Sequence, residues 1–310
     1  MSNLQIHIKN YLEYCIAQKR LDEKTVKAYR IDLRQFSEWV STTEAAEISA
    51  NIIEAYLTEL HQQYTPKTVK RKIASLKAFF HYLEYKEIID KNPFNKLHIK
   101  FREPIILPKT IPLPTIEILF NTIYMQYCNA PNNGKKRIVL RDIVVMEMLF
   151  ATGIRIFELC SMPYQNIDLK NNIIIIKGKG AKERLIHICD EHIVNVLNKY
   201  RSEYNEEILS CGYFFVNNIG NRLSDQSVRE MINKYCCIAN IEQHITPHMF
   251  RHSFATLLLE ENVDIRYIQT MLGHSSISVT EIYTHVAMSK QKEILESKHP
   301  RKRMNILTRI

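Results

Sequence analysis

Two stretches in the first 95 residues repeat apolar side chains at the three- and four-residue steps of an amphipathic helix. In the stretch that follows Asp22, the apolar positions are Val26, Tyr29, Leu33, Phe36 and Val40. In the stretch that begins at Pro66, they are Ile73, Leu76, Phe80 and Leu83. Each stripe predicts a helix with one buried face, so residues 1–95 are expected to form an all-helical domain.

Both helices also carry basic side chains on a second face. In the first helix these are Lys27, Arg30 and Arg34, and in the second they are Lys67, Lys70, Arg71 and Lys77. A single basic helix face is commonly just solvated. Two such faces in one small helical module suit contacts with DNA phosphates, so these seven residues are candidate DNA-binding residues.

The pattern changes after the second helix. Residues 93–114 contain five prolines and no sustained helical period, which predicts an extended linker over residues 96–114. From Thr115 the pattern is again mainly helical, and the turn residues of NAPNNGKK (129–136) predict a loop. Two β-branched runs around Gly-Lys-Gly-Ala-Lys predict a hairpin in NNIIIIKGKGAKERLIHIC. The chain is therefore expected to be mainly α-helical with a small β-hairpin, with a second domain over residues 115–290 and a tail over 291–310.

Composition narrows the class of protein. The net charge is +9 and the sequence pI is about 9.1, which suits a polyanionic partner. The seven cysteines are odd in number and form no CxxC pair, which favours reduced thiols in the cytoplasm. No signal peptide and no long apolar run is apparent, so we expect an intracellular protein with no membrane segment. We also find no metal-binding motif and expect no cofactor.

Several short segments between residues 115 and 290 hold candidate catalytic residues. In ATGIRIFEL, Gly153 is expected to end one helix and Arg155 to begin the next, with Glu158 one turn on. This is also what an ordinary helix junction with an Arg/Glu pair looks like. At the hairpin turn, lysines such as Lys179 are usually solvated, but a lysine on a flexible turn can also deliver a proton to a leaving oxygen.

The segment TPHMFRHSFATLLLEENV (246–263) is more specific. Thr246 is a favourable N-cap and Pro247 a favourable first helical residue. His248 and Arg251 then lie one turn apart near the positive helix N-terminus, which points to an anion site. A structural histidine is the alternative.

In DIRYIQTMLGHSSISVTEIYTHV (264–286), Asp264 is expected to cap a short helix that Gly273 ends. The residues expected to face inward from this helix are Ile265, Ile268 and Leu272. His274 follows the helix, and Tyr283 is expected early in the next one. Taken alone, this tyrosine would be an ordinary core or half-exposed aromatic residue.

Together these segments resemble the active-site series of tyrosine recombinases, the phage integrase family. The likeness lies in Arg155, Lys179, the HxxR of His248 and Arg251, the LGH of His274, and Tyr283. It includes their order and their separations of 24, three and nine residues within the pairs 155–179, 248–251 and 274–283. The closest likeness is to Xer-type and transposon-borne integrases, and the proline-bearing linker and helical N-terminal region fit as well.

The resemblance implies a two-domain, C-shaped DNA clamp made of a SAM-like core-binding domain and a mixed α/β catalytic domain. It also implies that Tyr283 forms a 3′-phosphotyrosyl bond, that Lys179 is the acid for the leaving 5′ oxygen, and that Glu158 supports a neighbouring residue. Arg155 and Arg251 would bind the scissile phosphate, and His248 and His274 would assist. Four protomers, as a homotetramer or with a paralogue, would act on two double-stranded DNA sites with inverted repeats and form a Holliday junction.

Several alternatives stay open. A type IB topoisomerase uses similar chemistry but relaxes supercoils as a monomer, whereas a non-catalytic DNA-binding protein would not need every catalytic position filled. The sequence does not separate integration or excision of a mobile element from resolution of DNA dimers. The tail is equally compatible with docking in trans on a neighbouring protomer and with a frayed basic end. We expect a cytoplasmic, nucleoid-associated enzyme.

Overall fold

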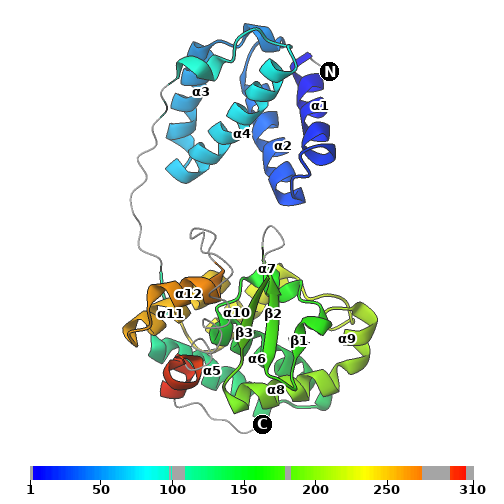
Figure 1. Ribbon diagram of the computed structural model, residues 1–310, viewed down its shortest axis with the longest axis vertical. Coiled ribbons are helices and arrows are strands. Elements are labelled where there is room, and N and C mark those ends of the chain that lie inside the picture. The colour runs from blue at the N-terminus through cyan, green and yellow to red at the C-terminus, as the bar shows by residue number, and fades with distance from the viewer. Residues whose placement is uncertain (1–2, 98, 100–108, 179–182, 274–293, 305–310) are drawn as a thin grey trace, which may run out of the picture. The chain divides into compact units, whose positions relative to one another are not determined.

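The protein is described by a computed structural model covering residues 3–97, 99, 109–178, 183–273 and 294–304. The chain divides into two compact units, Met1–Ile106 and Leu107–Ile310, and each has its own hydrophobic core (Figure 1). The structure is mostly helical with one small sheet, as the sequence predicts. In the part of the chain that is described, no helix has the length and apolar character needed to span a bilayer.

The first unit is all-helical, as expected. Its α-helices are α1 (Asn3–Ala17), α2 (Glu23–Trp39), α3 (Ala50–Gln63) and α4 (Pro66–Tyr85). The apolar stripes of α2 and α4 pack into the core of this unit, with Tyr29 only partly buried and Phe36, Phe79 and Phe80 fully enclosed. The first stripe continues one residue past the helix, because Val40 is the C-cap of α2 and is itself buried.

A buried carboxylate joins α2 to α4. Asp32 is 1% exposed and accepts hydrogen bonds from Lys72 Nζ at 3.3 Å and Ser75 Oγ at 3.0 Å, and it forms an ion pair with Arg71. A buried charge is costly unless it is paired, and here two cations and a hydroxyl supply the partners. This network fixes the two helices that bear the predicted basic faces.

The proline-rich segment is anchored at both of its described ends. Pro93–Lys96 forms a 3₁₀ helix with Phe94 buried in the first unit. At the other end, Ile111 is buried in the second unit, and its backbone N–H donates to Ser253 Oγ at 2.7 Å. Helix α5 already begins at Leu113, two residues before the expected start of the second domain.

The second unit is built around α6, which is buried along its whole length from Val139 to Thr152. Its α-helices are α5 (Leu113–Cys128), α6 (Asn133–Thr152), α7 (Ile156–Cys160), α8 (Glu191–Glu203), α9 (Asn205–Cys211), α10 (Asp225–Ile238), α11 (Pro247–Glu260) and α12 (Ile265–Leu272). Helices α5, α8 and α11 contact α6 directly. The core of this unit thus forms around one central helix.

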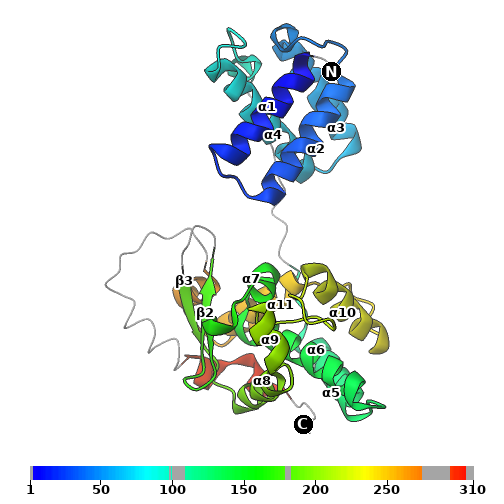
Figure 2. The same cartoon turned by 90° about the vertical axis from the view of Figure 1, so that its right-hand side faces the viewer.

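The predicted hairpin is present as part of a three-stranded antiparallel sheet. Strand β1 (Ile167–Asp168) pairs with β2 (Ile173–Lys177), which pairs with β3 (Glu183–His187). Figure 2 shows this sheet on the opposite side of the unit from α5 and α10. In the ladder Ile176 lies opposite Arg184 and Ile174 opposite Ile186, and the three isoleucines are buried.

The described part of the C-terminal tail packs against the second unit. Ile294, Leu295 and Met304 are buried in the core of that unit. In the 3₁₀ helix Pro300–Arg303, the guanidinium of Arg301 donates to both carboxylate oxygens of Glu147 on α6, at 2.9 and 3.2 Å. These contacts hold residues 294–304 in cis.

Two local expectations are wrong. The loop expected over residues 129–136 is shorter, because Asn132 accepts from the Lys135 N–H as a helix N-cap and α6 starts at Asn133. Ile265 does not face inward: it is 54% exposed at the first position of α12, while Ile268 and Leu272 are buried as expected. The inward face of α12 is completed instead by Met271, one helical turn beyond Ile268.

Candidate active site

Arg155 is placed by a sharp junction between α6 and α7. Gly153 caps α6 in the left-handed region at φ 57°, as the sequence predicts, and Arg155 is the N-cap of α7. A Cβ atom on Gly153 would lie 2.7 Å from Leu272 and 2.8 Å from Phe254. Glycine is therefore required here both for the backbone conformation and for the close approach of α11 and α12.

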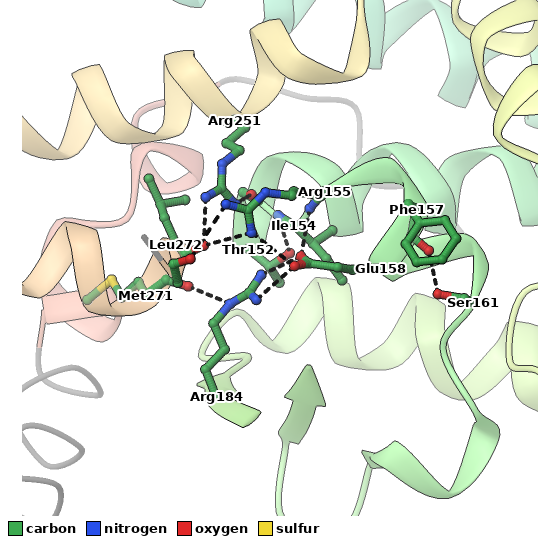
Figure 3. A network of polar contacts seen from close by, with 12 residues as sticks. Thr152, Ile154, Arg155, Phe157, Glu158, Ser161, Arg184, Arg251, Met271 and Leu272 are labelled. Carbon is green, nitrogen blue, oxygen red and sulfur yellow. Dashed lines mark hydrogen bonds and ion pairs between the residues drawn. The ribbon is translucent and has the colours of Figure 1, made fainter. Parts of the chain in front are cut away.

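Glu158 is the centre of the polar network in Figure 3. Its side chain accepts from the Arg155 backbone N–H at 3.1 Å and from Arg155 Nη1 at 3.0 Å. Arg184 donates to both oxygens of the same carboxylate, at 3.1 and 2.6 Å. These hydrogen bonds and the charge of Arg184 hold the pKa of Glu158 below its usual range, although burial alone acts to raise it.

Arg251 lies on α11, and its guanidinium group reaches the junction of α6 and α7 and the end of α12. It donates to the carbonyl oxygens of Gly153 at 2.8 Å and Leu272 at 2.6 Å, and it is only 5% exposed. Burial, followed by the positive charges of Arg155 and Arg184, lowers the pKa of Arg251 to about 10. The cluster therefore holds more positive charge than its own carboxylate balances, which suits an anion.

His248 lies in the first turn of α11, one turn before Arg251, and its side chain is exposed. Desolvation and then the positive charges of His252, Arg251 and Arg155 lower the pKa of His248. A neutral imidazole at pH 7 is able both to donate and to accept a hydrogen bond. Thr246 occupies the N-cap as predicted, but its side chain makes no capping hydrogen bond.

The end of α12 brings three backbone carbonyls to the arginines. Arg155 and Arg251 both donate to the oxygen of Leu272, and Arg155 also donates to that of Gly273 at 3.5 Å. Arg184 Nε donates to the oxygen of Met271 at 2.9 Å. The last carbonyls of a helix lack intrahelical partners and carry partial negative charge, so they are suitable acceptors for guanidinium groups.

Three of the candidate catalytic residues, Lys179, His274 and Tyr283, lie outside the described residues. In the sequence, His274 follows Gly273, the C-cap of α12, and Lys179 follows strand β2 by two residues. Among the described side chains, no group of His, Cys, Asp and Glu has an arrangement that would hold a metal ion.

Arg184 belongs to this cluster but was missed from the sequence. It stands two residues before Ile186 on β3, so the two-residue period of a strand puts it on the buried face. Its side chain is 9% exposed. A charged residue at an apolar-face position was the available signal, because such a residue requires a buried partner.

The seven candidate DNA-binding residues of the first unit are all exposed. Among them, Arg71 pairs with the buried Asp32, and Arg34 lies 3.5 Å from Glu38 one turn away. On contacting a DNA phosphate, each of these two side chains would either stay paired with its carboxylate or leave it for the phosphate.

Comparison with known proteins matches both units. Residues 122–290 match the model of the phage integrase family, and residues 8–87 match its N-terminal SAM-like domain. A tyrosine recombinase of Agathobacter rectalis is 58% identical over 302 residues, which cover 97% of this chain and 99% of the relative.

Two solved structures share the fold. XerH recombinase bound to its difH substrate has a TM-score of 0.71 at 20% identity, covering 93% of this chain and 96% of that one. A λ integrase tetramer bound to a Holliday junction has a TM-score of 0.66 at 16% identity, covering 90% and 80%.

A helical SAM-like domain followed by a mainly helical unit with a clustered arginine site defines a DNA strand-exchange enzyme of the integrase type. The chain belongs to the tyrosine recombinase family and is a site-specific DNA recombinase.

Proposed function

We propose that Arg155 and Arg251 bind the scissile DNA phosphate and that Tyr283 is the nucleophile that attacks it. The observation that carries this proposal is the excess of positive charge around Leu272 and Gly273. Three guanidinium groups gather there beside one carboxylate: Arg155 and Arg184 pair with Glu158, and Arg251 donates to the Leu272 carbonyl. Burial and the positive charges of Arg155 and Arg184 lower the pKa of Arg251 to about 10. A phosphate that gains negative charge in the transition state would relieve that repulsion.

In the proposed reaction, the Tyr283 oxygen forms a bond to phosphorus and the bond to the 5′ oxygen of the next nucleotide breaks. The phenol loses its proton during attack, and Lys179 protonates the leaving 5′ oxygen. The product is a 3′-phosphotyrosyl bond, which the 5′ hydroxyl of another strand reverses without an external energy source. His248 and His274 hydrogen-bond the phosphate or move protons, and Glu158 holds Arg155.

On the DNA, the exposed basic faces of α2 and α4 would contact backbone phosphates. We propose that four protomers, identical or mixed with a paralogue, bind two sites with inverted repeats and exchange strands through a Holliday junction. The DNA-bound XerH and the λ integrase tetramer on a Holliday junction support this assembly by their shared fold. The outcome would be integration or excision of a mobile element, or resolution of DNA dimers in the nucleoid.

A nicked suicide substrate tests the chemistry. Nicked duplexes from the DNA that flanks the gene are incubated with the full chain, and covalent protein–DNA complexes are separated on a denaturing gel. Wild-type protein should form such a complex, and Tyr283→Phe should form none while still binding the duplex. Mass spectrometry of the trapped peptide should identify Tyr283 as the modified residue.

Tyr267→Phe is the matched control, because Tyr267 lies on α12 of the same unit and is partly buried. It should trap DNA as the wild type does. A covalent complex that persists in Tyr283→Phe would refute the nucleophile assignment. Relaxation of supercoiled DNA without any sequence dependence would instead favour a topoisomerase.

A further inference from the structure

We propose that Arg184 is a positioning residue that fixes Arg155 and the end of α12 in the geometry needed for strand cleavage. This inference rests on the proposed function, since it concerns how the same site is held in place. Arg184 is the second residue of β3 and follows Lys179 by five residues in the sequence. It therefore links the hairpin to two other segments that carry candidate catalytic residues.

The first link runs through Glu158. Arg184 is bidentate to this carboxylate, and Glu158 in turn accepts from both the backbone and the guanidinium of Arg155. The Arg184 and Glu158 side chains are 9% and 6% exposed, whereas that of Arg155 is 36% exposed. The inner pair is thus the fixed part of the network, and Arg155 is its more accessible end.

The second link runs to the end of α12. Arg184 Nε donates to the Met271 carbonyl at 2.9 Å, two residues before Gly273 and three before His274. A Cβ atom on Gly273 would lie 3.1 Å from Arg184 Nη1 and 3.2 Å from Cδ. The guanidinium therefore rests against the backbone at the point where α12 ends.

Charge explains why this position requires a cation. Without Arg184, the buried Glu158 carboxylate would keep only Arg155 as a cationic partner within this hydrogen-bonded network. Arg155 would then be drawn toward Glu158, and its charge would be largely cancelled at the proposed phosphate site. With Arg184 present, Glu158 is balanced from inside the protein, and Arg155 is oriented without being neutralised.

Geometry explains why the cation is arginine. The three described hydrogen bonds leave from Nε, Nη1 and Nη2 and reach two different segments of the chain. A lysine ammonium is a compact point charge and cannot span a carboxylate and a distant carbonyl in this fork arrangement. Arg184→Lys should therefore keep the charge but lose the alignment.

The test compares cleavage rates of the full chain on the nicked suicide duplex. We expect Arg184→Gln and Arg184→Lys to cleave about 10- to 100-fold more slowly than wild type, because a small misplacement of catalytic groups costs about that much. Their affinity for the same duplex should stay close to that of wild type. Arg201→Gln, which removes an exposed arginine from α8, should change neither quantity and serves as the matched control.

A double-mutant cycle separates positioning from an independent effect. If Arg184 acts through Glu158, the combined Arg184→Gln/Glu158→Gln variant should cleave no more slowly than Arg184→Gln, since residues that act as a unit are non-additive. The proposal would be overturned if the rate loss of the double variant equalled the product of the losses of the two single variants. A cleavage rate of Arg184→Lys equal to that of wild type would overturn it too, and this variant keeps the buried charge if Arg184→Gln fails to fold. Absence of a covalent complex with the wild type would instead contradict the proposed function itself.

Discussion

The C-terminal tail docks on α6 of its own chain through a buried ion pair. Breaking this pair should lower the free energy of unfolding substantially. Arg301 and Glu147 have side chains that are 5% and 1% exposed and are joined by two hydrogen bonds. Replacing Arg301 with Met leaves the Glu147 carboxylate buried without its cation, which costs about 3–5 kcal/mol. For a unit of this size, that loss lowers the melting temperature by about 6–20 °C.

Arg303→Met is the matched control, because Arg303 lies in the same 3₁₀ helix but pairs with Glu261 at a site where both side chains are partly exposed. An exposed pair contributes about 0–1 kcal/mol, so this variant should unfold almost as the wild type does. Differential scanning calorimetry of the full chain gives the melting temperature of the catalytic unit. The single tryptophan, Trp39, lies in the first unit, so its fluorescence should not respond to either change.

The double variant Arg301→Met/Glu147→Met adds a further check. Removing both charges leaves no unpaired buried charge, so the loss of stability should be smaller than for Arg301→Met alone. If Arg301→Met shifts the melting temperature no more than Arg303→Met does, the tail does not dock in cis in solution and the reasoning is refuted.

Two further predictions concern Gly153 and His299. Gly153→Ala should destabilise the catalytic unit by about 2–4 kcal/mol, from left-handed strain and overpacking. Gly212→Ala should cost only the strain of about 1–2 kcal/mol, because no atom lies within 4 Å of its added Cβ; equal losses in urea denaturation would contradict this. Burial lowers the pKa of His299, whose Nδ1 accepts from the Arg301 N–H and whose Nε2 lies 3.1 Å from the Ala151 oxygen. The unfolded chain therefore binds more protons below about pH 6.5, and the free energy of unfolding should fall as the pH drops through that range. His299→Asn, which keeps the capping acceptor, should reduce this slope in urea titrations at several pH values; an unchanged slope would contradict the assignment.

Local sequence determined most of the elements. The three- and four-residue apolar stripes of α2 and α4 correspond to buried faces, because a helix can bury only the residues that share one side of it. Glycine at the left-handed ends of α6 and α12, and β-branched runs around a glycine-rich turn, fixed those boundaries through backbone sterics. The order and spacing of the arginines and histidines also sufficed to recognise the family.

What local sequence could not provide is which distant groups meet. Arg184 and Glu158 are 26 residues apart, and Arg301 and Glu147 are 154 apart. Each pair forms only when separate elements pack around α6, and neither partner carries a signal of the other in its neighbouring residues. The prediction that Ile265 faces inward was wrong for the same reason. A helical stripe does not show which of its residues the neighbouring elements cover.

The local sequence pattern therefore determined the helices and the hairpin and identified the family. Tertiary packing alone decided that Arg155 and Arg184 share one carboxylate, that these two and Arg251 donate to carbonyls at the end of α12, and that the tail packs onto α6. The physical reason is that a buried charge needs a partner, and the fold rather than the local sequence brings that partner into contact.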